Sequence, residues 1–120
     1  MKIKAFGKYP EIKLAYLFGS RAEGKAGPMS DYDFAVYFDE KTPSEKQFQI
    51  KLRLMGDLSD EFKTDKVDVV ILNDRLDPLL KYQAIRGKLI YSIEPYKIII
   101  EPQVLSEYFD FKVFLKHHGI

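Results

Sequence analysis

The sequence contains no cysteine, which excludes disulfides, thiolate catalysis and cysteine-ligated zinc or iron–sulfur clusters. It also lacks long apolar runs: the longest, such as residues 14–18 and 34–38, hold five residues. A membrane-spanning helix needs about twenty. The first residues lack the apolar core of a signal peptide. These absences predict a cytoplasmic protein with no membrane partner.

The chain also carries little excess charge. Its 19 basic and 18 acidic residues give a formal net charge of +1, so no bulk attraction to nucleic acid is expected. A nucleotide would have to be bound by a local site. With 120 residues, the chain has the size of one domain and no room for a separate substrate-recognition domain.

Apolar runs that alternate with turn and cap signals predict a single α/β (α+β) domain, with a mixed sheet of about four strands flanked by helices. The expected strands are residues 12–18, 32–38, 67–72 and 88–92. A long helix is expected to begin with Thr42 as N-cap and Pro43 at its first position, and to end near Phe62. Its apolar face is expected to be Phe48, Leu52, Met55 and Phe62.

The C-terminal segment is rich in aromatic residues. Residues 96–100 are expected to be extended and residues 102–117 helical. Tyr108, Phe111 and Leu115 are predicted to cover the core, leaving Phe109 and Phe114 partly exposed. Exposed aromatic residues often mark partner surfaces. A protein partner and self-association are therefore both open, as hetero- or homo-oligomer, beside plain core packing.

Chemistry is concentrated in residues 18–33. Asp31 and Asp33 stand at i and i+2, so in a strand both carboxylates point to the same face. Close like charges are unfavourable unless a cation neutralises them. Magnesium prefers oxygen ligands from a few carboxylates together with substrate phosphates. The pair therefore predicts a magnesium site at a strand edge.

Gly19 and Ser20 supply a second half of this candidate site. A glycine lets the backbone approach a phosphate closely, and a helix beginning at Ser20 would point N–H groups at an anion. The Ser20 hydroxyl adds a donor, and Arg21 adds positive charge. We expect these three residues to bind a nucleotide.

Asp68 is the candidate third carboxylate, because it interrupts an otherwise apolar strand, where an unpaired aspartate is costly. If its strand lies beside residues 32–38, three carboxylates converge on two metal ions. Asp68 is then a metal ligand or the general base.

Each of these residues also has a structural reading without function. Asp31 and Asp33 suit a solvated turn before a strand, and Ser20 suits a helix N-cap. Asp68 suits an edge strand protected by charge, and Arg21 suits the surface. The spacing of all four features together favours a catalytic site.

That combination resembles the signature of the DNA polymerase β-like nucleotidyltransferase superfamily: Gly19-Ser20, then residues 21–30, then Asp31-x-Asp33. The flanking Phe-Gly-Ser-Arg-Ala and Ser-Asp-Tyr-Asp-Phe-Ala-Val look like its minimal nucleotidyltransferase branch. Val-Asp-Val-Val at 67–70 matches the third acidic strand, and residues 86–91 look like the strand near the end of the catalytic core. The resemblance covers about residues 10–92.

The resemblance implies more than the residues do. It implies a catalytic core at 1–92. Residues 93–120, where the resemblance is thinner, are expected from their own sequence to form a helical C-terminal extension that packs on the core and offers a surface to a partner. The resemblance implies an enzyme that transfers AMP from ATP, with two Mg²⁺ ions, to a tyrosine of a HEPN-domain RNase toxin, thereby acting as its antitoxin. Asp31, Asp33 and Asp68 would be catalytic and hold the metals; Gly19, Ser20 and Arg21 would bind the nucleotide.

Two alternatives stay open. A binding module would neutralise its partner by masking, without catalysis. A small-molecule transferase of the aminoglycoside type would share the chemistry, but such relatives generally carry a larger second domain. The nucleotide base, the acceptor and the oligomeric state are not fixed by the sequence.

Overall fold

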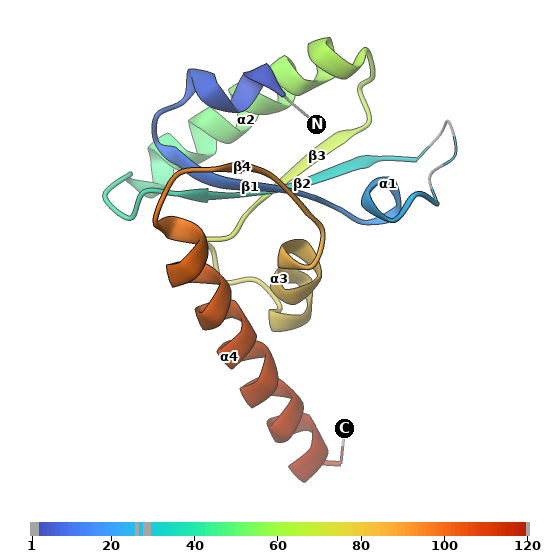
Figure 1. Ribbon diagram of the computed structural model, residues 1–120, viewed down its shortest axis with the longest axis vertical. Coiled ribbons are helices and arrows are strands. Elements are labelled where there is room, and N and C mark those ends of the chain that lie inside the picture. Colours follow the sequence, from blue (N-terminus) through green and yellow to red (C-terminus); the bar gives the residue numbers. More distant parts are fainter. Residues whose placement is uncertain (1–2, 26, 28–29, 120) are drawn as a thin grey trace.

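A four-stranded mixed sheet forms the centre of the computed structural model, which describes residues 3–25, 27 and 30–119 (Figure 1). Its strands are β1 (Ile12–Phe18), β2 (Tyr32–Phe38), β3 (Val67–Ile71) and β4 (Lys88–Ser92). The strand order is β3-β2-β1-β4. The first strand, β1, pairs antiparallel with both β2 and β4, whereas β2 and β3 run parallel. The predicted fold class is confirmed.

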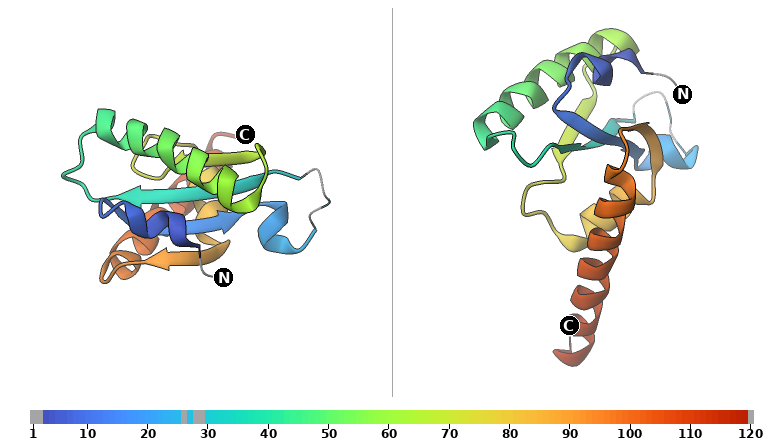
Figure 2. Two further views of the ribbon diagram at one scale, coloured as in Figure 1. Left: turned by 90° about the horizontal axis from the view of Figure 1, so that it is seen from above. Right: turned by 60° about the vertical axis from the view of Figure 1, so that its left-hand side comes forward.

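Helices cover both faces of this sheet, as Figures 1 and 2 show from three directions. On one face lie the 3₁₀ helix η1 (Lys4–Lys8) and the long helix α2 (Ser44–Phe62). On the other lie α3 (Pro78–Ile85) and α4 (Tyr96–His117). The single turn α1 (Ser20–Glu23) stands at the end of β1. The molecule thus has three layers.

The strands alternate between two apolar cores. Ile12, Ala15 and Leu17 of β1 point toward η1 and α2, whereas Leu14 and Tyr16 point toward α3 and α4. All five are at most 2% exposed. Burial on both faces explains why β1 and β2 are almost continuously apolar rather than alternating with polar residues.

Helix α2 differs from its prediction in two respects. It begins at Ser44 with Pro43 as N-cap, and no side chain caps it; the predicted Thr42 cap is wrong. Thr42 is instead buried, and its carbonyl oxygen accepts a hydrogen bond from the Gln47 amide at 2.9 Å.

The predicted core face of α2 is also wrong in part. The buried residues are Gln47, Ile50, Leu54 and Leu58. Phe48 and Leu52 are 55% and 52% exposed, and only Met55 and Phe62 of the expected face pack against the core.

Helix α4 begins earlier than predicted. Residues 96–100 are helical rather than extended, and Pro102 lies inside the helix. Phe109 and Phe114 are exposed, at 55% and 51%, as predicted. Tyr108, Phe111 and Leu115 are half-buried, and their coverage of the core stays a prediction. Among the described residues no helix has the length and apolar character to cross a membrane.

Candidate active site

The turn from β1 into α1 places Gly19 directly against Asp33. Gly19 has φ +74° and ψ −158°, a conformation that side chains rarely adopt. A Cβ atom at this position would lie 2.7 Å from Asp33 Oδ2. The neighbouring residue Phe18 pairs with Asp33 in the antiparallel register of β1 and β2. Only glycine therefore allows the turn and the carboxylate to lie this close.

Three carboxylates lie at one end of the sheet. Asp31 precedes β2, Asp33 is the second residue of β2, and Asp68 is its register partner in the parallel strand β3. Burial raises the pKa of the Asp33 carboxyl above its ordinary value, and the negative charges of Asp68 and Asp31 raise it further. The fold thus brings together the three carboxylates that the sequence singled out.

Repulsion among these groups is the condition that a divalent cation relieves, and carboxylate oxygens are the ligands that Mg²⁺ prefers, so the donor types fit this metal. Their arrangement is not that of a preformed cage. Within the described part of the chain, no group of three or more histidine, cysteine, aspartate or glutamate side chains is placed to hold a metal ion. The exposed Asp68 carboxylate instead accepts a hydrogen bond at 3.0 Å from the backbone N–H of Val69.

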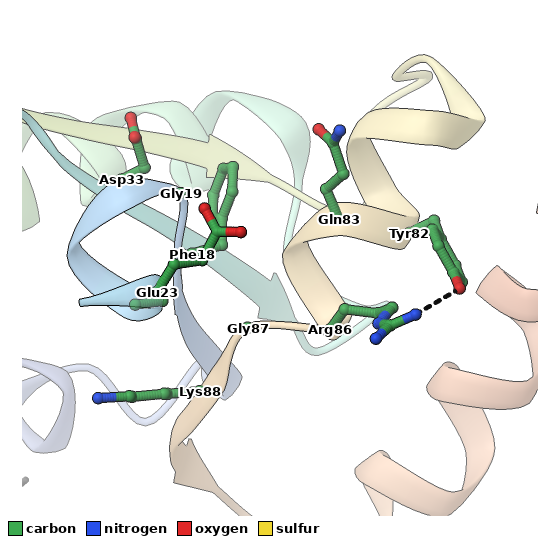
Figure 3. Close-up of a pocket in the computed structure, with 10 residues that line it drawn as sticks. Phe18, Gly19, Glu23, Asp33, Tyr82, Gln83, Arg86, Gly87 and Lys88 are labelled. Atoms are coloured by element: carbon green, nitrogen blue, oxygen red, sulfur yellow. Dashed lines mark hydrogen bonds between the residues drawn. The ribbon is translucent and has the colours of Figure 1, made fainter. Parts of the chain in front are cut away.

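A cavity of about 720 Å³ opens beside Gly19 and Asp33 (Figure 3). This volume lies in the range of small-molecule sites. One wall comes from the β1–α1 turn and the start of β2, and the other from α3 and the start of β4. Ten residues line it: Phe18, Gly19, Ala22, Glu23, Asp33, Tyr82, Gln83, Arg86, Gly87 and Lys88.

Comparison with known proteins identifies the family. Residues 2–96 match the family described as polymerase beta, nucleotidyltransferase. The chain belongs to this family. It is also 33% identical over 96 residues to the protein adenylyltransferase MntA of Aphanizomenon flos-aquae, a match that spans 76% of this chain and 64% of that protein. The chain therefore spans slightly less than two thirds of the curated relative's length.

Solved structures show the same nucleotidyltransferase fold. One is a toxin–antitoxin crystal structure with AMP-PNP, with TM-score 0.74 and 21% identity, covering 95% of this chain and 89% of that one. Another is a complex of an MNT antitoxin with the tri-AMPylated HEPN toxin of Shewanella oneidensis, with TM-score 0.62 and 19% identity, covering 92% and 82%.

Of the residues predicted to bind the nucleotide, Gly19 lines the cavity and Ser20 begins α1 beside it. Arg21 extends toward the loop before β2. Its Nη2 donates to the Ser30 carbonyl at 3.0 Å, and its guanidinium carbon lies 4.2 Å from the centre of the Tyr32 ring. Three residues of this loop, at positions 26, 28 and 29, lie outside the described residues.

Sequence reasoning missed the second wall of the cavity. Tyr82 and Gln83 lie on α3, Arg86 is the C-cap residue after it, and Lys88 begins β4. Residues 86–91 resembled a family strand but signalled no role in binding. Gly87 was the one local cue: a Cβ there would overlap the Leu17 carbonyl oxygen and lie 2.9 Å from Phe18 Cβ. This close approach joins the two walls.

Proposed function

We propose that this chain transfers AMP from ATP to a hydroxyl of an acceptor protein, and that the acceptor is a tyrosine of a HEPN-domain toxin which the chain thereby neutralises. The observation that carries the chemistry is the placement of Asp33, between Asp31 and Asp68 and against Gly19, in the wall of a nucleotide-sized cavity. The named acceptor rests on the relatives, which include a protein adenylyltransferase and an antitoxin bound to an AMPylated HEPN toxin. Because ATP is the donor, we place the reaction in the cytoplasm.

The cavity offers complementary charge to a nucleoside triphosphate. Arg86 and Lys88 bring positive charge to one wall. Their attraction to phosphate offsets the repulsion that Asp33 and Glu23 would otherwise exert on an anion. The glycine turn at Gly19 lets the backbone approach the phosphates. We assign Gly19 and Ser20 to the triphosphate, and Arg21 either to the triphosphate or to holding the loop that ends at Ser30.

Asp31, Asp33 and Asp68 would hold Mg²⁺. When bound, magnesium would supply neutralisation of phosphate charge and a lowered pKa of the attacking hydroxyl. The hydrogen bond between Asp68 and the Val69 N–H has to be exchanged for this role, because it occupies Oδ1 of the carboxylate.

The transfer itself is an in-line displacement. The acceptor oxygen forms a bond to the α-phosphorus, and the bond from that phosphorus to the bridging oxygen breaks, so that pyrophosphate leaves. Asp68, the exposed one of the two carboxylates that lie in strands, accepts the proton of the acceptor hydroxyl. The contribution of the protein is mainly position and electrostatics.

The test is transfer of label from ATP labelled on its α-phosphate to the HEPN-domain toxin, in the presence of Mg²⁺. Asp31→Asn/Asp33→Asn is expected to lower the transfer rate by about 10³-fold or more, because each lost carboxylate removes several kcal/mol of transition-state stabilisation. The matched control is Asp60→Asn/Asp74→Asn, which removes two exposed carboxylates away from the cavity and should leave the rate unchanged.

Neutralisation of the toxin is measured in parallel. If Asp31→Asn/Asp33→Asn still forms the complex and still suppresses RNase activity, the chain acts by masking and the proposed chemistry is wrong. Equal label transfer by wild type and variant would also contradict it, because the carboxylates would then have no catalytic role.

A further inference from the structure

Helix α4 carries two apolar stripes, and folding accounts for only one. The inner stripe consists of Ile100, Val104, Tyr108, Phe111 and Leu115, spaced at helical intervals of three and four residues. Ile100 and Val104 are buried against the sheet and α3, and the other three are half-buried. This stripe holds the helix on the body of the domain.

The outer stripe consists of Ile98, Leu105, Phe109 and Val113, which also share one helical face. Ile98 is 70% exposed, Phe109 and Val113 are each 55% exposed, and Leu105 is half-buried. In Figure 1 the C-terminal half of α4 extends beyond the other elements. The radius of gyration, 14.8 Å, correspondingly exceeds the value of about 13.6 Å usual for this length.

The outer stripe is continuous with the wall of the cavity. Arg86, which lines the cavity, donates a hydrogen bond to the Tyr82 hydroxyl at 3.0 Å (Figure 3). The Tyr82 ring stacks on Tyr108 of α4, with 3.9 Å between ring centres and 6° between planes. Tyr108 in turn contacts Phe109, with ring centres 5.7 Å apart. Aromatic side chains thus form an uninterrupted path from the nucleotide pocket to the exposed face of α4.

Two lysines lie on one side of the outer stripe. Lys112 lies 5.7 Å from the centre of the Tyr108 ring, and Lys116 follows one turn later. Among the described residues neither lysine takes part in an ion pair, whereas Lys81 on α3 pairs with Glu107 and Lys97 pairs with Glu101. A partner on this surface would therefore meet an apolar stripe with Lys112 and Lys116 on one side and the exposed Asp110 toward the other.

From this continuity and charge we infer that the outer stripe of α4 binds the acceptor protein, through an amphipathic helix of that protein with acidic residues beside its apolar face. This inference rests on the proposed transfer to a protein acceptor. The surface brings the acceptor near the cavity, because Phe109 of the outer stripe contacts Tyr108, which stacks on the cavity-lining Tyr82. Binding on α4 supplies orientation of the acceptor hydroxyl relative to the cavity.

The test compares two matched pairs of exposed residues. Phe109→Ser/Val113→Ser removes the centre of the outer stripe. Phe48→Ser/Leu52→Ser is the control, since these residues also lie four apart on a helix and are 55% and 52% exposed, but on the opposite face of the sheet. The HEPN-domain toxin is titrated against each variant, and the binding of ATP to each variant is measured separately.

Loss of the outer stripe is expected to weaken toxin binding by about tenfold or more, the loss typical when central interface residues are truncated. The control pair should change binding by less than about twofold. Under label transfer, Phe109→Ser/Val113→Ser should raise KM for the toxin and leave kcat and ATP affinity unchanged. Lys112→Glu/Lys116→Glu should weaken toxin binding more at low salt than at high salt, because salt screens the charges.

Three outcomes would overturn the inference. Equal effects of the two serine pairs would show that α4 has no special role, and a larger effect of the control pair would move the interface to α2. A wild-type dimer in sedimentation that only Phe109→Ser/Val113→Ser dissociates, with toxin binding intact, would assign the outer stripe to a second copy. If toxin binding depends on the outer stripe but wild type transfers no label, the proposed catalysis is wrong and the inferred interface is still supported.

Discussion

The two helical layers are attached to the same sheet in different ways. Helix α2 lies along the sheet and buries residues at regular intervals over its length, from Gln47 to Leu58. Helix α4 is longer, yet its only buried residues are Ile100 and Val104, both in its first half. The α2 layer is thus explained by folding alone. The α3–α4 layer forms one wall of the cavity and leaves apolar surface uncovered, as expected where a helix also serves a partner.

The largest expected effect is a difference in stability between the layers. Leu54→Ala in α2 removes a fully buried side chain and should lower the free energy of unfolding by about 3 kcal/mol. The same substitution at Leu115 of α4, which is half-buried, should cost less than about 1 kcal/mol. Urea unfolding measures both. Equal losses would show that the end of α4 is packed as firmly as α2.

The next effect concerns the joint between the cavity walls. Gly87→Ala should destabilise the fold by about 2 kcal/mol and raise KM for ATP, because the added methyl group overlaps the Leu17 carbonyl oxygen and forces β4 away from β1. Gly56→Ala in α2 is the matched control. No atom lies within 4 Å of its new Cβ, so helix propensity should stabilise it by about 0.7 kcal/mol. Thermal unfolding measures the stability of both variants. If Gly87→Ala is as stable and as active as wild type, the close packing of Gly87 against Leu17 and Phe18 is refuted.

Asp33→Asn should separate stability from activity at one residue. The pKa of Asp33 is raised in the folded chain, so its stabilising contribution is present only at pH below its unfolded pKa and is lost as pH rises through the folded pKa. At pH 7 the asparagine variant, which stays neutral, should therefore be more stable than wild type.

That gain should disappear near pH 4, and label transfer should be abolished at every pH. The stability gain is tested by comparing the unfolding midpoints of wild type and Asp33→Asn at pH 7 and pH 4, with Asp60→Asn as control. A variant that is less stable than wild type at pH 7 would contradict the expected repulsion.

The smallest effect lies in the α2 layer at high pH. Burial, together with a 2.5 Å hydrogen bond to Asp57, raises the pKa of Tyr9 from 10.0 to about 12. Its stabilisation is fully present below pH 10 and is lost as pH rises toward 12. Tyr9→Phe should therefore cost about 0.5 kcal/mol at pH 8 and nothing near pH 12.

Denaturant unfolding over this pH range gives the difference between wild type and Tyr9→Phe. The Tyr16→Phe variant serves as a control in the α3–α4 layer, because Tyr16 donates to Glu101 of α4 rather than to α2. In a Tyr16→Phe background, the stabilities with Tyr9 and with Phe at position 9 should still become equal near pH 12. A difference in the free energy of unfolding between wild type and Tyr9→Phe that stays constant from pH 8 to pH 12 would contradict the raised pKa of Tyr9.

Much of the sheet was predictable because its residues alternate between two covered faces. The bounds expected for β1, β2 and β4 agree with the structure, and β3 ends one residue earlier than expected, at Ile71. The face of α2 was not predictable from spacing alone, because Phe48 and Leu52 fit a helical stripe as well as Ile50 and Leu54 do. The choice is made by tertiary contacts.

The start of α4 was missed because Pro102 was taken as a boundary. Proline removes the N–H that would bond to the Ile98 carbonyl. Ile98 is 70% exposed, so that carbonyl can be hydrated and the helix continues through the proline. In the site, the sequence motifs predicted the group formed by Gly19, Asp31, Asp33 and Asp68. The roles of these residues in metal and nucleotide binding stay predictions. Tyr82, Gln83 and Arg86 were not predictable, because polar residues on a short helix look like an ordinary solvated face.

The pairing of β1 on both sides has a consequence for when activity can arise. Its end aligns Phe18 with Asp33 of β2 and Leu17 with Lys88 of β4. The chain that emerges first therefore contains the carboxylates and the glycine turn, but the cavity closes only when the fourth strand returns to pair with the first. Such non-local closure comes late in folding. A nascent or truncated chain would carry the motif without a site, and enzymatic activity would report completion of the sheet.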